Sequence, residues 1–154
     1  RYFAASPWAD RLDAVCRPLQ NFEAGGFDHI FSNPPFYDNS LHNPSERLAA
    51  ARHTVSLTPA DICAFAASRL PEGGRLSLIV PSESEKGLLR TAASFGLYPS
   101  RIVRVKTVEG KAPRRIVAEF AKSRTSEVAE EELVLQEAGG RSARYRQLTG
   151  DFYL

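Results

Sequence analysis

Apolar and polar residues alternate along the chain in a pattern that predicts short strands separated by helices. Residues 12–16 and 27–31 show the period-two alternation of half-buried strands. Further apolar runs bounded by turn residues predict strands at residues 75–80, 100–106, 115–121 and 131–136. Between the first two strands, residues 17–26 are predicted to be a connector with a possible helical turn. Much later in the chain, the polar, acidic residues 123–132 are predicted to be a solvated loop.

Three segments carry the start signals of helices. Asn43 and Thr58 each precede a proline, which is favoured at the first helical position. Residues 82–85 resemble a capping box, and Gly96 is a plausible stop for the helix that follows them. A short amphipathic helix is expected within residues 142–154.

The order of these elements indicates an α/β domain with a largely parallel sheet, and we expect residues 1–154 to form a single domain. In such sheets, ligands bind beyond the carboxyl ends of the strands. Asn33 directly follows the strand predicted at residues 27–31 and therefore lies at such an end.

Composition narrows the class of protein only slightly. The formal net charge is +2 over 154 residues, which is too small to indicate a nucleic-acid partner by itself. The two cysteines, Cys16 and Cys63, lie in apolar segments without metal-ligand spacing, so we expect two core residues, no metal and a reducing, cytoplasmic location. No segment approaches the roughly 20 apolar residues of a membrane span.

The segment Asn33, Pro34, Pro35 and Phe36 is the strongest candidate for chemistry. The prolines fix the backbone, so the Pro34 carbonyl and the Asn33 side-chain carbonyl present two neutral acceptors to one amino group. Phe36 adds an apolar surface on which a planar base can stack. Acceptors that hold the hydrogens of a conjugated amine favour a pyramidal nitrogen and so stabilise the transition state of its methylation.

The run from residue 27 to residue 36 resembles the strand-four signature of class I S-adenosylmethionine-dependent amino-methyltransferases. Residues 6–11, 51–53 and 148–154 are similar to further segments of one branch, the bacterial tRNA(Val) adenine-N(6)-methyltransferases. The resemblance implies a Rossmann-like sheet, mostly parallel with an antiparallel C-terminal hairpin. It also implies S-adenosyl-L-methionine as cofactor and tRNA as partner.

The resemblance implies that an adenine is flipped into the site, that its amino group bonds Asn33 and the Pro34 carbonyl, and that Phe36 stacks on the ring. The cofactor contacts implied for this chain are Pro18, Leu19 and Asn33. Pro18 stands where the family has an acidic residue, and the chain contains no Gly-x-Gly-x-Gly. The resemblance therefore implies that strands one and two, with the N-terminal half of the same domain, lie upstream, and that this chain alone binds cofactor poorly.

Basic residues suggest where RNA phosphates bind. Seven lie between residues 101 and 122, and the loop that carries Lys111, Arg114 and Arg115 is predicted to join two strands. Arg47 and Arg52 are expected on the helix after the catalytic loop. Charges that discourage edge pairing are the alternative interpretation of the strand residues.

Two other functions remain open. The same motif serves N-methylation of protein glutamine, rRNA guanine or DNA adenine. A chain without its cofactor half also fits a non-catalytic RNA-binding or interaction module.

Overall fold

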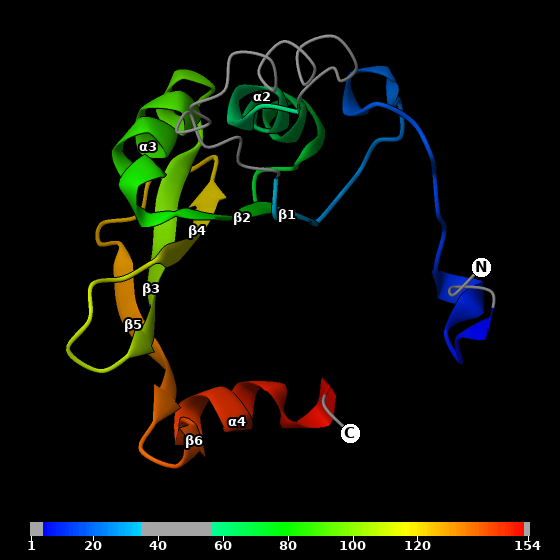
Figure 1. Ribbon diagram of the computed structural model, residues 1–154. Coiled ribbons are helices and arrows are strands. Elements are labelled where there is room, and N and C mark those ends of the chain that lie inside the picture. The colour runs from blue at the N-terminus through cyan, green and yellow to red at the C-terminus, as the bar shows by residue number, and fades with distance from the viewer. Residues whose placement is uncertain (1–4, 35–56, 153–154) are drawn as a thin grey trace, which may run out of the picture.

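One curled, six-stranded β-sheet organises residues 5–34 and 57–152, the part of the chain that the computed structural model describes (Figure 1). Its strands stand in the order β1-β2-β4-β3-β5-β6. Their bounds are β1 His29–Ser32, β2 Arg75–Pro81, β3 Tyr98–Val108, β4 Arg115–Ala121, β5 Ala129–Glu137 and β6 Gly140–Arg141. Because β4 inserts between β2 and β3, strands that are neighbours in sequence are not always neighbours in the sheet.

Strand directions agree with the predicted α/β class and correct one detail of it. β1 and β2 are parallel, as are β3 and β5, whereas β2–β4, β3–β4 and β5–β6 are antiparallel. The predicted hairpin of β3 and β4 is confirmed. The expectation of a mostly parallel sheet is wrong for the described strands, because a six-residue loop allows β4 only to turn back beside β3.

Helix α2, Pro59–Arg69, begins at the predicted cap. The Asp61 carboxylate accepts hydrogen bonds from the Thr58 backbone N–H at 2.8 Å and from the Thr58 hydroxyl at 2.6 Å. In return, the Thr58 Oγ1 accepts the Asp61 N–H at 3.1 Å. The hydrogen bonds from Thr58 lower the pKa of Asp61. This reciprocal cap satisfies backbone donors that a helix start otherwise leaves unpaired.

Helix α3, Glu85–Ser94, follows the short 3-10 helix η4, Ser82–Ser84. The predicted capping box at residues 82–85 is wrong, because Ser84 occupies the cap position and makes no side-chain cap hydrogen bond. The Ser82 hydroxyl instead donates to the Pro113 carbonyl, across the sheet edge. Gly96, with φ of +73°, follows the last turn and confirms the predicted stop.

The hydrophobic core lies between one face of the sheet and helices α2 and α3. Alternate residues of β2 and β4 point into it, as their burial patterns show. The prediction that Cys63 is a core residue is confirmed, since its exposed fraction is 0%. The core consists of Ile62, Cys63, Ala66, Leu70, Leu76, Leu78, Val80, Leu88, Ala92, Leu97, Ile102, Ile116, Ala118 and Phe120.

The segment before β1 differs from the prediction. Residues 12–16 form no strand; the coil around them is flanked by the 3-10 helices η2, Ala9–Arg11, and η3, Leu19–Asn21. Leu12 and Val15 are 40% and 49% exposed, and Cys16 is exposed rather than part of the core. A strand forms only where a partner strand takes its backbone hydrogen bonds, and none of the six described strands lies beside residues 12–16.

The C-terminal part is more regular than the sequence suggested. β5 begins at Ala129, so the prediction of a loop over residues 123–132 is wrong for its last four residues. The short helix expected after residue 142 is confirmed as α4, Ala143–Thr149, followed by the 3-10 helix η5, Gly150–Phe152. Buried Ser142 fixes α4 to the sheet: its hydroxyl donates to the Val134 carbonyl at 2.5 Å and accepts the Tyr145 N–H at 3.1 Å.

Within residues 5–34 and 57–152, no helix combines the length and the apolar character that crossing a bilayer requires.

Candidate functional site

The register of the sheet gathers the predicted functional segments at one edge. Ser32 pairs with Leu78 in the parallel β1–β2 ladder, and Arg115 pairs with both Pro81 and Val105. β1, β2 and β3 therefore all end at the edge where β4 begins. Asn33 follows β1 at this edge, level with Ile79 of β2. Measured across the sheet, it lies about two strand spacings, roughly 10 Å, from β4. We call this edge the carboxyl edge.

Asn33 is exposed, and the structure records no hydrogen bond from its side chain to another described residue. Burial from His29 to Pro34 alternates, with Asn33 on the exposed side and Pro34 buried on the core side. The backbone is thus held by the sheet and by buried Pro34 while the Asn33 amide stays accessible. Pro35 and Phe36 lie outside the described residues.

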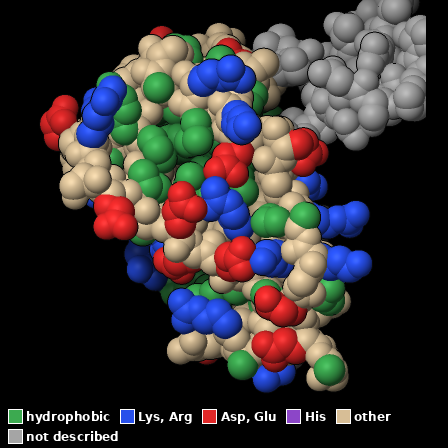
Figure 2. Space-filling view, turned by 90° about the vertical axis from the view of Figure 1, so that its left-hand side faces the viewer, with side chains coloured by type: hydrophobic (Ala, Val, Ile, Leu, Met, Phe, Trp, Pro, Cys, Tyr) green, Lys and Arg blue, Asp and Glu red, His purple; other side chains and the backbone are tan. Residues whose placement is uncertain are grey.

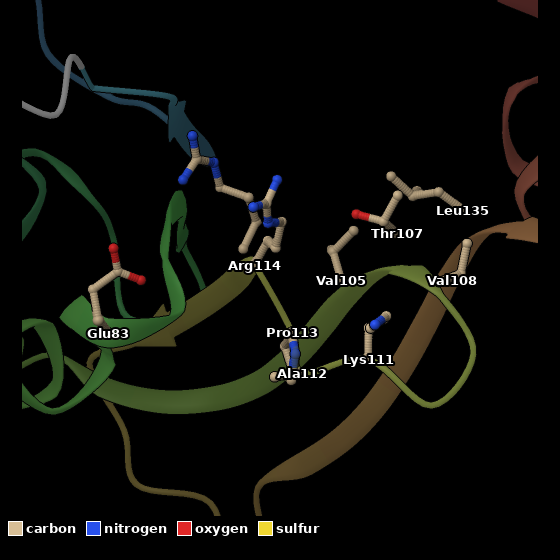
Figure 3. Close-up of a pocket in the computed structure, with 10 residues that line it drawn as sticks. Glu83, Val105, Thr107, Val108, Lys111, Ala112, Pro113, Arg114 and Leu135 are labelled. Carbon is tan, nitrogen blue, oxygen red and sulfur yellow. The ribbon is translucent and has the colours of Figure 1, made fainter.

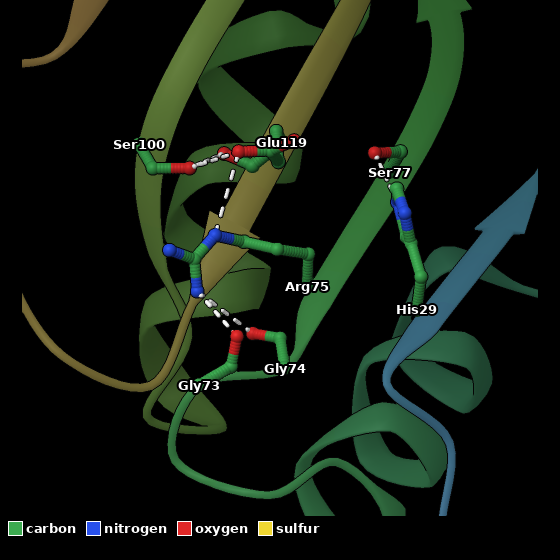
Figure 4. Close-up of polar contacts among 7 residues, drawn as sticks. All are labelled: His29, Gly73, Gly74, Arg75, Ser77, Ser100 and Glu119. Atoms are coloured by element: carbon green, nitrogen blue, oxygen red, sulfur yellow. Dashed lines mark hydrogen bonds and ion pairs between the residues drawn. The ribbon is translucent and has the colours of Figure 1, made fainter.

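His29, on strand β1, lies too far from Asn33 to act as a base beside it. His29 lies four residues earlier, about 13 Å along the strand, and its Nε2 is 2.8 Å from the Ser77 hydroxyl (Figure 4). Nearby on the same end of the sheet, Glu119 accepts a hydrogen bond from Ser100 at 2.9 Å and pairs with Arg75 at 3.6 Å. These polar groups satisfy one another at the end opposite the carboxyl edge.

Of the two predicted cofactor residues before β1, Leu19 lies against helix α2 and Pro18 is exposed. Pro18 is exposed at the cap of η3, and Leu19 is half-buried against the core. Leu19 lines a hollow of about 300 Å³ with Phe22 and with Phe65 of α2, among other residues. Asn33 does not line this hollow, so the structure does not bring Leu19 and Asn33 together in one described cavity.

Lys111, Arg114 and Arg115 line a second hollow, of about 1020 Å³, which we call the edge hollow (Figure 3). All three side chains are exposed, and none forms an ion pair with another described residue. The remaining lining residues are Glu83, Val105, Thr107, Val108, Ala112, Pro113 and Leu135. The edge hollow thus combines three free cations, one carboxylate and an aliphatic surface.

Four hydrogen bonds hold the loop of residues 109–114 at the carboxyl edge. The Ser82 hydroxyl donates to the Pro113 carbonyl at 2.7 Å, and the Ser82 N–H donates to the Arg114 carbonyl at 3.3 Å. The N–H groups of Arg114 and Lys111 donate to the carbonyls of Val105 and Val108 at 2.9 and 3.4 Å. The loop is therefore anchored to the ends of both β2 and β3.

Three other basic residues of the 101–122 cluster are already paired. Arg101, Arg104 and Lys106 contact acidic residues of β5 at 2.9, 2.7 and 2.6 Å, and Arg104 also contacts Glu85 of α3 at 2.8 Å. The hydrogen bond from Arg101 lowers the pKa of the Glu131 carboxyl. Figure 2 shows acidic and basic side chains interspersed on this side of the molecule. The cations of β3 therefore serve as partners of acidic side chains on β5 and do not form a phosphate-binding row. The alternative interpretation, charge that discourages edge pairing, does not apply to them either, because β3 lies between β4 and β5.

The remaining predicted RNA contacts, Arg47 and Arg52, lie outside the described residues. Sequence inspection missed Ser82, Glu83 and Leu135 as parts of the carboxyl edge. They belong to no motif, and only the strand register brings them to the loop that carries Lys111. Across the described ranges, no three His, Cys, Asp or Glu side chains converge as metal ligands.

Comparison with known proteins confirms the resemblance inferred from the motif. The chain is 34% identical over 151 residues to the tRNA1(Val) (adenine(37)-N6)-methyltransferase of Tolumonas auensis, an alignment that covers 97% of this chain and 63% of that protein. Proteins of the same name from Shewanella amazonensis and a Bacteroides fragilis strain are 34% and 31% identical, over 99% and 97% of this chain and 66% and 65% of their own lengths. The chain thus spans just under two thirds of these relatives. No family model matches it.

A solved structure supports the fold independently. The crystal structure of a predicted O-methyltransferase, protein Atu636 from Agrobacterium tumefaciens, superposes with a TM-score of 0.58 at 19% identity. The match covers 80% of this chain and 51% of that one. At this identity the likeness shows a shared Rossmann-like fold only.

Proposed function

We propose that the protein carrying this chain transfers a methyl group from S-adenosylmethionine to the N6 amino group of adenine 37 in tRNA1(Val), the activity named for its homologues. The single observation that carries the proposal is the exposed Asn33 amide, which has no side-chain partner among the described residues. It stands next to buried Pro34, at the carboxyl edge of a parallel strand pair. In open α/β sheets, ligands bind beyond the carboxyl ends of the strands, which supports a reacting site at this edge.

In the proposed reaction the Asn33 side-chain carbonyl and the Pro34 carbonyl accept the two hydrogens of the adenine amino group. These bonds strengthen as the nitrogen becomes pyramidal and positive, so they stabilise the transition state more than the bound substrate. Phe36 stacks on the adenine ring and orients the amino group. A histidine base is unnecessary, because the amine proton becomes acidic only as the new bond forms.

The cofactor fits the chain at its reacting end. When bound, S-adenosylmethionine supplies an electrophilic methyl group. Asn33 is exposed just beyond the end of β1, and its side chain makes no competing hydrogen bond within the described residues. Pro18 and Leu19 remain predicted contacts for the adenine of the cofactor, limited to van der Waals contact because neither side chain carries a donor or acceptor.

The RNA is proposed to cross the carboxyl edge with its phosphates against Lys111, Arg114 and Arg115. Their position beside the end of β2 supports this path, as does their freedom from ion pairs in the described part of the chain. Arg47 and Arg52 are proposed to add phosphate contacts. Such contacts position the strand without reading its sequence.

The test is methyl transfer from radiolabelled S-adenosylmethionine to unmodified tRNA1(Val), compared with a glutamine peptide and an adenine-containing DNA duplex. We expect labelled N6-methyladenine in the tRNA alone. Asn33→Ala should lower turnover about 100- to 1000-fold, by analogy with the loss of one oxyanion donor, with an unchanged circular dichroism spectrum. His29→Ala, on the same strand but bonded to Ser77, serves as the control and should retain activity.

Methylation of the peptide or DNA in place of tRNA would replace the proposed substrate. Turnover by Asn33→Ala close to that of the unmodified protein would remove the motif from the mechanism.

A further inference from the structure

The edge hollow offers more than phosphate contacts. Its cations Lys111 and Arg114 come from the loop after β3, whereas Val105, Val108 and Leu135 provide aliphatic surface from β3 and β5 (Figure 3). Glu83 of η4 adds a carboxylate to the lining. A site for phosphate alone needs cations and backbone donors, so the aliphatic surface remains unexplained by that role.

A nucleotide matches this combination of groups. Its phosphate is anionic, the faces of its base are apolar, and its ribose and base edges carry hydrogen-bond donors that a carboxylate can accept. The volume, about 1020 Å³, is at the upper end of the usual range for small-molecule pockets, roughly 300–1,000 Å³. A nucleotide that enters the hollow remains partly exposed, as a residue of a continuing strand must be.

The hollow also lies where a flanking nucleotide would pass. Arg115 is opposite Pro81, and Asn33 follows the strand next to β2, so the edge hollow and the proposed methylation site share the carboxyl edge. We propose that the edge hollow is a subsite for one RNA nucleotide that flanks the target adenine. Its base rests on Val105 and Leu135, and its phosphate contacts Lys111 and Arg114.

The inference rests on the proposed function, because tRNA methylation identifies the bound strand as RNA. To the proposed phosphate contacts it adds a contact with one base. Since the surface is aliphatic and lacks an aromatic ring, the base contact belongs at or below the weak end of the range measured for stacking on aromatic side chains. We therefore expect a contribution of about fivefold in affinity.

The experiment is a thermodynamic cycle between protein and RNA. Fluorescence anisotropy gives the Kd of a labelled stem–loop RNA that contains adenine 37, and of the same RNA with a single abasic residue at each loop position in turn. In the unmodified protein, one position flanking the adenine should lose about fivefold in affinity when its base is removed. In Leu135→Ser that loss should fall below about twofold, because the contact is already absent.

Leu133→Ser is the matched control, since Leu133 is also half-buried on β5 and does not line the hollow. It should retain the full abasic loss. If Leu135→Ser proves unfolded by circular dichroism, Val108→Ser at the end of β3 replaces it. The subsite would be overturned if removing a base cost the same affinity in the unmodified protein and in Leu135→Ser (or Val108→Ser) at every loop position.

A second arm tests the phosphate side. The double variant Lys111→Ala with Arg114→Ala should reduce the slope of log Kd against log salt by about 2, one for each lost contact. Lys86→Ala with Arg90→Ala removes two exposed cations from α3 outside the hollow and should leave the slope unchanged. Equal slopes for both double variants would contradict the assignment.

The two proposals fail in different ways. A normal rate for Asn33→Ala in methyl transfer would remove the proposed function and leave the binding cycle intact. If Asn33→Ala lost methyl transfer but base removal weakened RNA binding equally in the unmodified protein and in Leu135→Ser, only the subsite would be removed.

Discussion

Replacing Ser82 by alanine tests how the carboxyl edge is assembled. The change removes the hydrogen bond from the Ser82 hydroxyl to the Pro113 carbonyl, 2.7 Å long and partly buried, and leaves the backbone bond to Arg114 in place. A hydrogen bond of this kind contributes about 1 kcal/mol net to stability. We therefore expect the free energy of unfolding to fall by about 1 kcal/mol.

The effect on RNA follows from the same number. About 1 kcal/mol corresponds to roughly fivefold in an equilibrium constant. The ratio of docked to undocked loop can therefore fall by at most about fivefold. Because only the docked loop presents Lys111 and Arg114 at the edge, the Kd for the stem–loop RNA should rise by up to fivefold. A strongly docked loop would give a smaller rise, since the docked form would still dominate.

Urea unfolding and fluorescence anisotropy measure the two effects. Ser94→Ala is the matched control: it removes a hydroxyl bond of equal length, 2.7 Å to the Thr91 carbonyl, within α3 and away from the loop. It should change stability without changing RNA affinity, and Ser82→Thr, which keeps a hydroxyl, should restore both. If Ser82→Ala weakens RNA binding no more than Ser94→Ala does, the hydroxyl has no part in presenting the loop.

Three further predictions concern the scaffold. Thr58→Ala should lower the free energy of unfolding by about 1 kcal/mol in urea through loss of the α2 cap; no change would show that the cap adds nothing. Leu78→Ala, at 0% exposure, should cost about 2–5 kcal/mol, and exposed Ile79→Ala on the same strand much less; equal costs would contradict the assigned faces. Burial raises the pKa of the Cys63 thiol from 9.0 to about 11. The unfolded chain then releases this proton first, so stability should fall as pH rises between these values and Cys63→Ala should lack that part of the slope; identical slopes would contradict a buried thiol.

Local signals predicted several elements well. Thr58 followed by Pro59 and Asp61 predicted the start of α2, because a cap depends only on residues within one turn. The apolar run of residues 75–80 predicted β2. Residues 27–36 predicted amine methylation, and their resemblance together with residues 6–11, 51–53 and 148–154 predicted the tRNA substrate proposed here, without any knowledge of the sheet.

Predictions failed where the outcome depended on distant partners. Residues 12–16 alternate like a strand, yet no described strand lies beside them to take their hydrogen bonds. Glu130 and Glu132 suggested a solvated loop, but Arg104 and Lys106 on the neighbouring strand pair with them and allow β5 to begin at Ala129.

Sequence alone determined the chemistry on offer: two amide-type acceptors on a proline-stiffened segment, and a basic loop some 80 residues further along. Tertiary structure alone decided that these lie at one edge of the sheet, because the insertion of β4 between β2 and β3 returns the chain to the end of β2. It also decided which cations stay free, since Arg101 is neutralised by Glu131 while Lys111 faces the hollow. Both outcomes depend on pairings between residues distant in sequence, which no local pattern encodes.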